Sequence, residues 1–271
     1  MITITDKEFR HLAKYIKGNY GINLREEKRA LVMGRLQNTL LSQNFDNFTD
    51  YFAYIAADKT GKAARTLIDK LTTNHTYFMR EAGHFDFFKN EVLPYLTNHV
   101  ATRDLRIWSA GCSTGEEPAT LAMIMDEYFG TEKSMWDTRI LATDISSKVL
   151  DKASKGIYKS NNLALLPPMW KMNYFNKINP EQSVLTKKIR NEIIYRKFNL
   201  MEAEFPFRRK FHVIFCRNVM IYFDHKTKLE LVSKLYDLTE PGGYLFVGHS
   251  ESLHRDETKY KYILPAVYRK E

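Results

Sequence analysis

The chain has 271 residues, and its 41 Lys and Arg against 32 Asp and Glu give a formal net charge of +9. With 44% hydrophobic and 27% charged residues, the composition is typical of a globular protein and excludes disordered, collagen-like and low-complexity chains. No apolar run approaches the ~20 residues needed to span a bilayer, and the N-terminal MITITDKEFR lacks the apolar core of a signal peptide. The charge predicts an acidic partner: nucleic acid, an anionic membrane or an acidic protein surface.

Cysteine and histidine usage narrows the chemistry. Cys112 and Cys216 form neither a disulfide framework nor a CxxC metal motif, so we expect a reducing, cytoplasmic compartment and two inert thiols. The eight histidines show no metal-ligand spacing, so we expect no metal.

Hydrophobic periodicity predicts two domains. Residues 1–75 show apolar residues at helical spacing and form a predicted all-helical N-terminal domain, whose first helix Gly18 and Gly21 should interrupt. After a linker over 76–90, the second domain (91–271) alternates short apolar runs with helical segments. This alternation predicts an α/β fold with a mostly parallel, doubly wound sheet.

Three parts of the second domain are predicted in more detail. Residues 118–129 should form an amphipathic helix. Residues from about 160 to 197 fit neither periodicity well and are expected to be a small inserted β-subdomain. The tail over 262–269 is expected to be a final strand that pairs antiparallel at the sheet edge.

The segment WSAGCSTGEEP (108–118) places two glycines between a strand and a helix, where the backbone can approach a ligand closely. It is neither a dinucleotide fingerprint nor a Walker A loop. Glu116 and Glu117 suit the helix dipole, but they could also bind an ammonium group. Asp144 ends the next strand, where an acid binds ribose hydroxyls or caps the following helix. Together these residues indicate an adenosine-type ligand that lacks phosphates.

A hydrolase is an alternative, because GCSTG also matches the nucleophile elbow G-x-S-x-G. Ser113 would then be the nucleophile, with Asp144 and His249 following in hydrolase order. Only predicted helices precede this strand, however, whereas hydrolases build half of the oxyanion hole from an earlier strand. The context therefore disfavours this alternative.

Six segments together resemble the CheR-type chemotaxis receptor methyltransferases, which use S-adenosylmethionine to esterify glutamates of chemoreceptors. In chain order they are TNHTYFMRE, WSAGCSTGEEP, LATDIS, FNL, IFCRNVMIYFD and LFVGHSE. The resemblance spans nearly the whole chain. It implies a Rossmann-like methyltransferase domain behind the helical domain, a linker that carries cofactor contacts, and S-adenosylhomocysteine as the product.

The resemblance also implies roles for individual residues. The catalytic residues would be Arg80 and Tyr222, which orient the acceptor without transferring protons. The cofactor-binding residues would be Asn74, Thr76, Arg80, Glu117, Asp144, Asn199, Leu200, Arg217 and Asn218. Two positions depart from the family pattern: Met79 replaces an aromatic residue, and Ala119 replaces a tyrosine.

The implied partner is the helical bundle of a chemoreceptor cytoplasmic domain, bound by a monomeric, cytoplasmic enzyme. Arg25, Lys28, Arg29 and Arg35 could dock its acidic face, or they could be an ordinary solvated helix face. The insertion corresponds to the family's β-subdomain, which in some members grips a receptor C-terminal tether peptide.

Two alternatives stay open at this stage. The stretch 187–210 holds eight Lys and Arg, interleaved with Tyr195, Phe198, Phe205 and Phe207, which suits a nucleic-acid methyltransferase. Cys216-Arg217-Asn218-Val219 stands where base methylases carry an Asn/Asp-Pro-Pro-aromatic loop, so we expect no nucleic-acid partner. A sensor that binds the cofactor without turnover is the other alternative.

Overall fold

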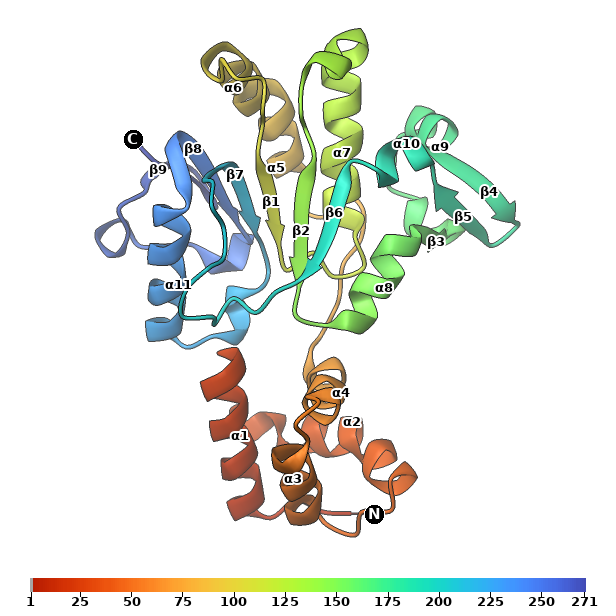
Figure 1. The fold of residues 1–271 in the computed structure, drawn as a ribbon, viewed down its shortest axis with the longest axis vertical. Coiled ribbons are helices and arrows are strands. Elements are labelled where there is room, and N and C mark those ends of the chain that lie inside the picture. Colours follow the sequence, from red (N-terminus) through yellow and green to blue (C-terminus); the bar gives the residue numbers. More distant parts are fainter. Residues whose placement is uncertain (1) are drawn as a thin grey trace.

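The computed structural model describes residues 2–271, and its N-terminal body is all-helical (Figure 1). This body consists of α1 (Asp6–Tyr20), the short η1 (Glu26–Lys28), α2 (Arg29–Ser42), α3 (Phe48–Ala57) and α4 (Lys62–Leu71). Its apolar side chains form a core of their own. A capping box between Thr5 and Glu8 starts α1, and Gly21, at φ +71°, ends it. Gly18 lies inside this helix, so the prediction of a break there is wrong.

A seven-stranded sheet forms the centre of the second body and confirms the predicted α/β class. Its order is β6-β2-β1-β7-β8-β10-β9. The strands are β1 (Ile107–Ala110), β2 (Ile140–Asp144), β6 (Ile193–Lys197), β7 (Phe211–Cys216), β8 (Thr239–Val247), β9 (Lys261–Leu264) and β10 (Val267–Arg269). The first five in spatial order are parallel, and β10 is antiparallel to both β8 and β9. The tail is thus a hairpin with β9 at the edge, rather than one edge strand.

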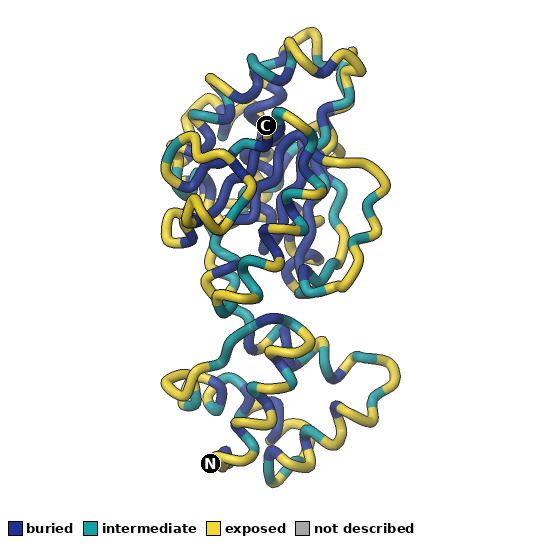
Figure 2. The backbone as a smooth tube through the Cα atoms, turned by 90° about the vertical axis from the view of Figure 1, so that its left-hand side faces the viewer, coloured by how far each residue is buried: buried dark blue, intermediate teal, exposed yellow. Residues whose placement is uncertain are grey.

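Helices cover both faces of this sheet. They are α5 (Ala82–Phe87), the π-helical η2 (Phe88–Val92), α6 (Leu93–His99), α7 (Glu116–Phe129), α8 (Ser147–Lys155) and α11 (His225–Asp237), with short turns η3 (Gly130–Met135), η5 (Met220–Tyr222), η6 (His249–Glu251) and η7 (Arg255–Glu257). Alternate strand residues face two separate cores: Ile107 packs with α5 to α7, and Trp108 packs with α11. Figure 2 shows the buried sheet within this body and the separate buried core of the N-terminal helices. Among residues 2–271, no helix is long and apolar enough to cross a bilayer.

The inserted region packs beside α7. A three-stranded sheet, β3 (Ile157–Lys159), β5 (Gln182–Leu185) and β4 (Phe175–Asn179), is joined by η4 (Ser160–Leu163), α9 (Pro168–Tyr174) and α10 (Lys187–Arg190). The segment therefore holds helices as well as strands, and Ile193–Lys197, assigned to it from sequence, instead pairs with β2 in the main sheet.

This packing corrects the amphipathic assignment of α7. Nearly all its residues are buried, and the helix already begins at Glu116. Its outward-facing Asp126 accepts hydrogen bonds from Tyr174 Oη at 3.1 Å and from Lys188 Nζ at 2.7 Å. The small subdomain covers most of the polar face of α7, and Glu127 is the one exposed residue of the helix.

Candidate active site

A cavity lies at the carboxyl ends of β1, β2 and β7, between the sheet edge and the N-terminal body. All ten residues predicted to bind cofactor or orient the acceptor line it: Asn74, Thr76, Arg80, Glu117, Asp144, Asn199, Leu200, Arg217, Asn218 and Tyr222. Other parts of its wall are Tyr20 and Ile22 from the N-terminal body and the chain over 71–77. Ligands of open α/β sheets bind at the carboxyl ends of the strands, because the loops that follow the parallel strands form a crevice there.

Two glycines of the loop lie in close contact with neighbouring protein side chains, while the approach of the loop to a ligand stays a prediction. Gly111 has φ +90°, and a Cβ there would lie 2.4 Å from Val219 Cγ2. Gly115 has φ +93°, and its Cβ would lie 2.8 Å from Tyr195 Oη. Both positions therefore require glycine on two grounds, the backbone angle and the space.

Asp144 is held rigidly at the floor of the cavity. Its Oδ2 accepts from the Ser113 N–H and its Oδ1 from the Ser146 N–H, each at 2.9 Å. Burial raises the pKa of this carboxyl, and the backbone donors oppose the shift. The N-cap of α8 is Ser146, whose side chain accepts from Val149 N. The helix-cap alternative for Asp144 is therefore wrong, and each of its oxygens keeps a lone pair for a ligand hydroxyl.

Arg217, which directly follows β7, is the buried cation of the site, with 2% of its side chain exposed. It donates to Glu117 Oε2 at 2.9 Å, to Glu81 Oε2 at 3.1 Å and to the Arg80 carbonyl. Burial raises the pKa of Glu117 against the pull of this guanidinium. Since its other oxygen accepts from Ser109 Oγ at 2.8 Å, Glu117 is committed to protein partners as well as lining the cavity.

The sequence analysis did not identify two carboxylates that bind Arg217 and Asn218, those of Glu81 and Glu251. Glu81, in the left-handed region at φ +57°, accepts from Asn218 Nδ2 at 3.2 Å as well as from Arg217. Burial alone would raise its pKa, but the Arg217 charge and the Asn218 amide outweigh it, and the pKa lies below its usual value. Buried Glu251 accepts from the N–H groups of Asn218 and Gly248, both at 2.6 Å. The signal was present, because TNHTYFMRE and LFVGHSE both end in these glutamates.

Arg80 differs from Arg217 in the partners of its guanidinium group. Its guanidinium donates to the His75 carbonyl at 2.7 Å and lies 6.0 Å from the Tyr77 ring centroid. Among residues 2–271 it pairs with no carboxylate. Nearby, Tyr222 Oη donates to the Thr73 carbonyl at 3.4 Å. The cavity thus offers a cation that is still available to an anionic ligand.

The N-terminal body closes one side of the cavity through direct bonds. The Asn199 amide donates to the Asn19 carbonyl at 2.7 Å, and the Asn23 N–H donates to the Tyr222 carbonyl at 2.8 Å. One of the two amide hydrogens of Asn199 is therefore used in the domain contact. Buried Leu200 beside it supplies an apolar wall.

The predicted docking cluster divides into two pairs. Arg25 and Lys28 are exposed. Arg29 forms an ion pair with Asp6, and Arg35 donates to the Leu71 carbonyl at 2.6 Å and to Thr73 Oγ1 at 3.0 Å. Arg35 thereby holds the end of α4 to the linker.

The residues that suggested nucleic-acid binding are largely structural. Phe198, Phe205 and Phe207 all pack edge-on against Trp108, with ring centroids 4.9–6.0 Å from the indole. All three rings are partly buried and pack against the core cluster that contains Trp108, so they contribute to the fold of this stretch.

The hydrolase alternative also lacks its geometry. Ser113 Oγ donates to the Asn74 carbonyl at 3.2 Å, and no hydrogen bond joins Ser113 to a histidine within the described chain. The two cysteines are fully enclosed, and burial raises the pKa of both thiols well above the ordinary value, which makes them poor nucleophiles.

The two departures from the family pattern are both accommodated. Met79 adopts φ +60° and is partly buried against the main core, and Arg80 after it still reaches the cavity. Ala119 is fully buried within α7, so the small side chain sits at a packed position.

Comparisons with known proteins agree with this architecture. A family model described as "CheR methyltransferase, SAM binding domain" matches residues 74–268, and one described as "CheR methyltransferase, all-alpha domain" matches residues 7–72. A chemotaxis protein methyltransferase of Borreliella burgdorferi is 42% identical, over 99% of this chain and 96% of that protein. One of Escherichia coli is 34% identical, over 96% of this chain and 89% of that protein.

We predict that Glu81→Gln lowers the free energy of unfolding by about 1–3 kcal/mol, because a buried guanidinium loses one of its two carboxylate partners. Urea unfolding followed by tryptophan fluorescence measures this, since Trp108, Trp136 and Trp170 all lie in the second domain. Glu132→Gln is the matched control, because Glu132 is exposed and should change stability by less than about 0.5 kcal/mol. Equal effects of the two substitutions would contradict the anchoring role of Glu81.

Proposed function

Because the chain belongs to the CheR methyltransferase family, it is an S-adenosylmethionine-dependent methyltransferase of chemotaxis, and we propose that it esterifies glutamate carboxylates of chemoreceptor cytoplasmic domains. The observation that carries this proposal is the pairing within one cavity of a rigid carboxylate, Asp144, and a free cation, Arg80. The first suits the nucleoside of the cofactor, and the second suits an acidic acceptor.

The residues present fit the cofactor. Asp144 retains lone pairs for ribose hydroxyls, and Phe198, Leu200 and Ile145 offer an apolar wall for adenine. Gly111 leaves the backbone of the loop accessible, and Glu117 adds negative charge for an ammonium group. Asn74 and Thr76 line the linker side. When bound, S-adenosylmethionine supplies an activated methyl group.

The protein's own task is then orientation. A glutamate carboxylate is already ionised at neutral pH, so the acceptor needs no general base. Arg217 already pairs with two carboxylates, Glu81 and Glu117, whereas Arg80 is free to hold the incoming carboxylate beside Tyr222. Holding reactants in line can supply several kcal/mol, while an overly tight ion pair would stabilise the ground state. Exclusion of water from the cavity by the bound cofactor and acceptor would favour a step in which charge is neutralised.

We predict that Arg80→Ala lowers kcat/KM for the receptor about 100-fold or more, because the acceptor loses its orienting cation. The assay follows labelled methyl groups from S-adenosylmethionine onto a receptor cytoplasmic domain, and base-labile release as methanol identifies the ester. Arg208→Ala, at an exposed position, is the matched control.

Parallel arms separate the alternatives in the same assay. Receptor with glutamines in place of its methylated glutamates, and RNA, should accept no label. If Arg80→Ala retained both cofactor binding and full transfer, this role of Arg80 would be wrong. Binding of the cofactor without turnover on any receptor would favour the sensor alternative.

Receptor docking is proposed for Arg25 and Lys28, the two exposed members of the basic cluster. Their charges would steer the acidic face of the receptor bundle. We predict that the double substitution R25E/K28E lowers kcat/KM several-fold at low salt and has little effect at high salt, where charges are screened. R35E serves as a contrast, since it should reduce stability by disrupting the linker contacts. An unchanged kcat/KM of R25E/K28E at low salt would exclude docking there.

Tethering is proposed for the three-stranded subdomain. Its outer strands β3 and β4 each have an unpaired edge, and Ile157 and Ile178 on them are about half exposed, at 44% and 49%. An extended receptor C-terminal peptide could add a strand at such an edge. Calorimetric titration with that peptide tests the idea, and Ile178→Lys should weaken binding if β4 is the edge used. Absence of any heat change would exclude tethering.

We also propose a monomeric enzyme acting in the cytoplasm. The N-terminal body, the linker and the loops of the second body jointly line the cavity. The cytoplasmic receptor segment and the two free thiols are consistent with a reducing compartment. Sedimentation at micromolar concentration would reveal a dimer if one formed.

A further inference from the structure

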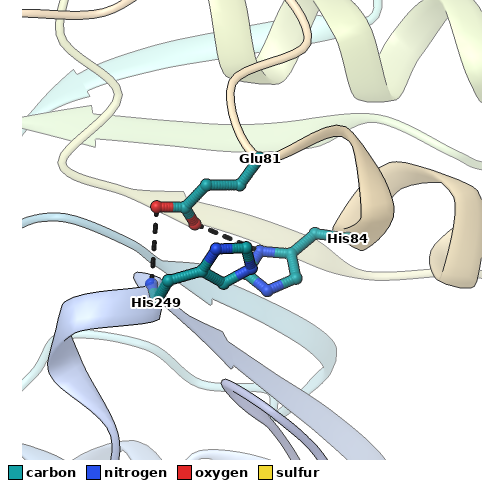
Figure 3. A group of neighbouring side chains, drawn as sticks. All are labelled: Glu81, His84 and His249. Atoms are coloured by element: carbon teal, nitrogen blue, oxygen red, sulfur yellow. Dashed lines mark hydrogen bonds and ion pairs between the residues drawn. The ribbon is translucent and has the colours of Figure 1, made fainter.

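Three side chains with metal-ligating atoms converge behind Arg217. They are Glu81, which ends the linker, His84 of α5 and His249 of η6, and their ligand atoms all lie within 4.8 Å of one another. Figure 3 shows the two imidazole rings together beneath the Glu81 carboxylate. His84 Nδ1 lies 3.5 Å from Glu81 Oε2, and the two rings meet edge-on with centroids 4.7 Å apart.

His84 is a buried ligand without a partner. It is 1% exposed, and neither ring nitrogen has a hydrogen-bond partner within residues 2–271. The Pro265 carbonyl lies beside the ring but outside hydrogen-bonding geometry. Burial and the Arg217 charge lower the pKa of His84 to about 4, so the ring is neutral at pH 7. Buried polar groups are almost always satisfied, and an exception requires an explanation such as an ion.

Carboxylates offset the positive charge of Arg217, which by itself disfavours a second cation beside His84. Three carboxylates, Glu81, Glu117 and Glu251, lie around the single guanidinium of Arg217 or bond to its neighbour Asn218. Two imidazoles and one carboxylate are a typical ligand set for zinc, with a fourth position left open. Tetrahedral zinc needs ligand atoms about 3.3 Å apart. Exposed His249 can rotate to close the difference without moving the buried His84.

We propose that Glu81, His84 and His249 form an inhibitory site for zinc or a similar divalent transition-metal ion. Binding would draw the Glu81 carboxylate toward the metal and away from Arg217 and Asn218, to which it now bonds at 3.1 and 3.2 Å. The cavity wall formed by these two residues would then loosen. The metal site stands on the three side chains alone, whereas the inhibition rests on the proposed methyl-transfer function.

The test titrates zinc chloride into the chain without an affinity tag, followed by calorimetry in the absence of cofactor and receptor. We expect one zinc ion per chain, and binding at least tenfold weaker in His249→Asn. His249 does not line the cavity and its backbone N–H is kept, so this variant should fold and retain basal activity. His254→Asn, another exposed histidine close by in the chain, should bind zinc like the unmodified protein.

Methyl transfer is then measured with and without equimolar zinc. Inhibition of the unmodified chain and of His254→Asn, but not of His249→Asn, supports the complete proposal. Absence of binding, or equal binding by His249→Asn, overturns the metal site. Site-specific binding without inhibition overturns the inhibitory role. Because calorimetry needs no turnover, failure of the proposed methyl transfer leaves the binding result interpretable.

Discussion

The architecture depends on the buried guanidinium of Arg217. A charge with 2% of its side chain exposed is tolerable only when paired, since an unpaired buried ion costs several kcal/mol. Its three partners come from two places: Glu117 on α7, and the adjacent Arg80 carbonyl and Glu81 carboxylate in the linker. Satisfying one ion therefore fixes the linker against the sheet edge. The linker in turn carries the N-terminal helices over the cavity.

This constraint assigns different tasks to the two arginines of the site. Arg217 forms ion pairs with Glu81 and Glu117 within the protein, and Arg80 remains available to an acidic acceptor. The same distinction applies to the net charge of +9. Lys188 and Arg209 form ion pairs with Asp126 and Asp104, so part of the basic stretch that suggested nucleic acid binds the protein itself. Each such pair cancels one positive and one negative charge, so the net charge stays at +9 while fewer cations of the basic stretch remain unpaired.

Sequence reasoning succeeded where the signal was local. Alternating periodicity predicted the α/β sheet, and the strand-to-helix glycines required by positive φ predicted the loop at its edge. The sequence-based predictions were wrong where contacts between segments far apart in the chain determine burial and strand pairing. Lys188 and Tyr174 cover the polar face of α7, and β6 joins the main sheet through pairing with β2. Arg35 resembled a docking residue because its carbonyl partner at Leu71 is 36 residues away.

By itself, then, the sequence determined the fold class, the glycine loop and the residue types that line the cavity, because periodicity, turn chemistry and motif order are properties of neighbouring residues. Only the tertiary structure decided which charges are free and which are paired. Glu81 and Glu251 bind Arg217 and Asn218 through hydrogen bonds between residues 33 to 137 positions apart in the chain. His84 is buried by segments that are also distant in sequence. Pairing depends on distance and burial, and neither is encoded in the spacing of residues along the chain.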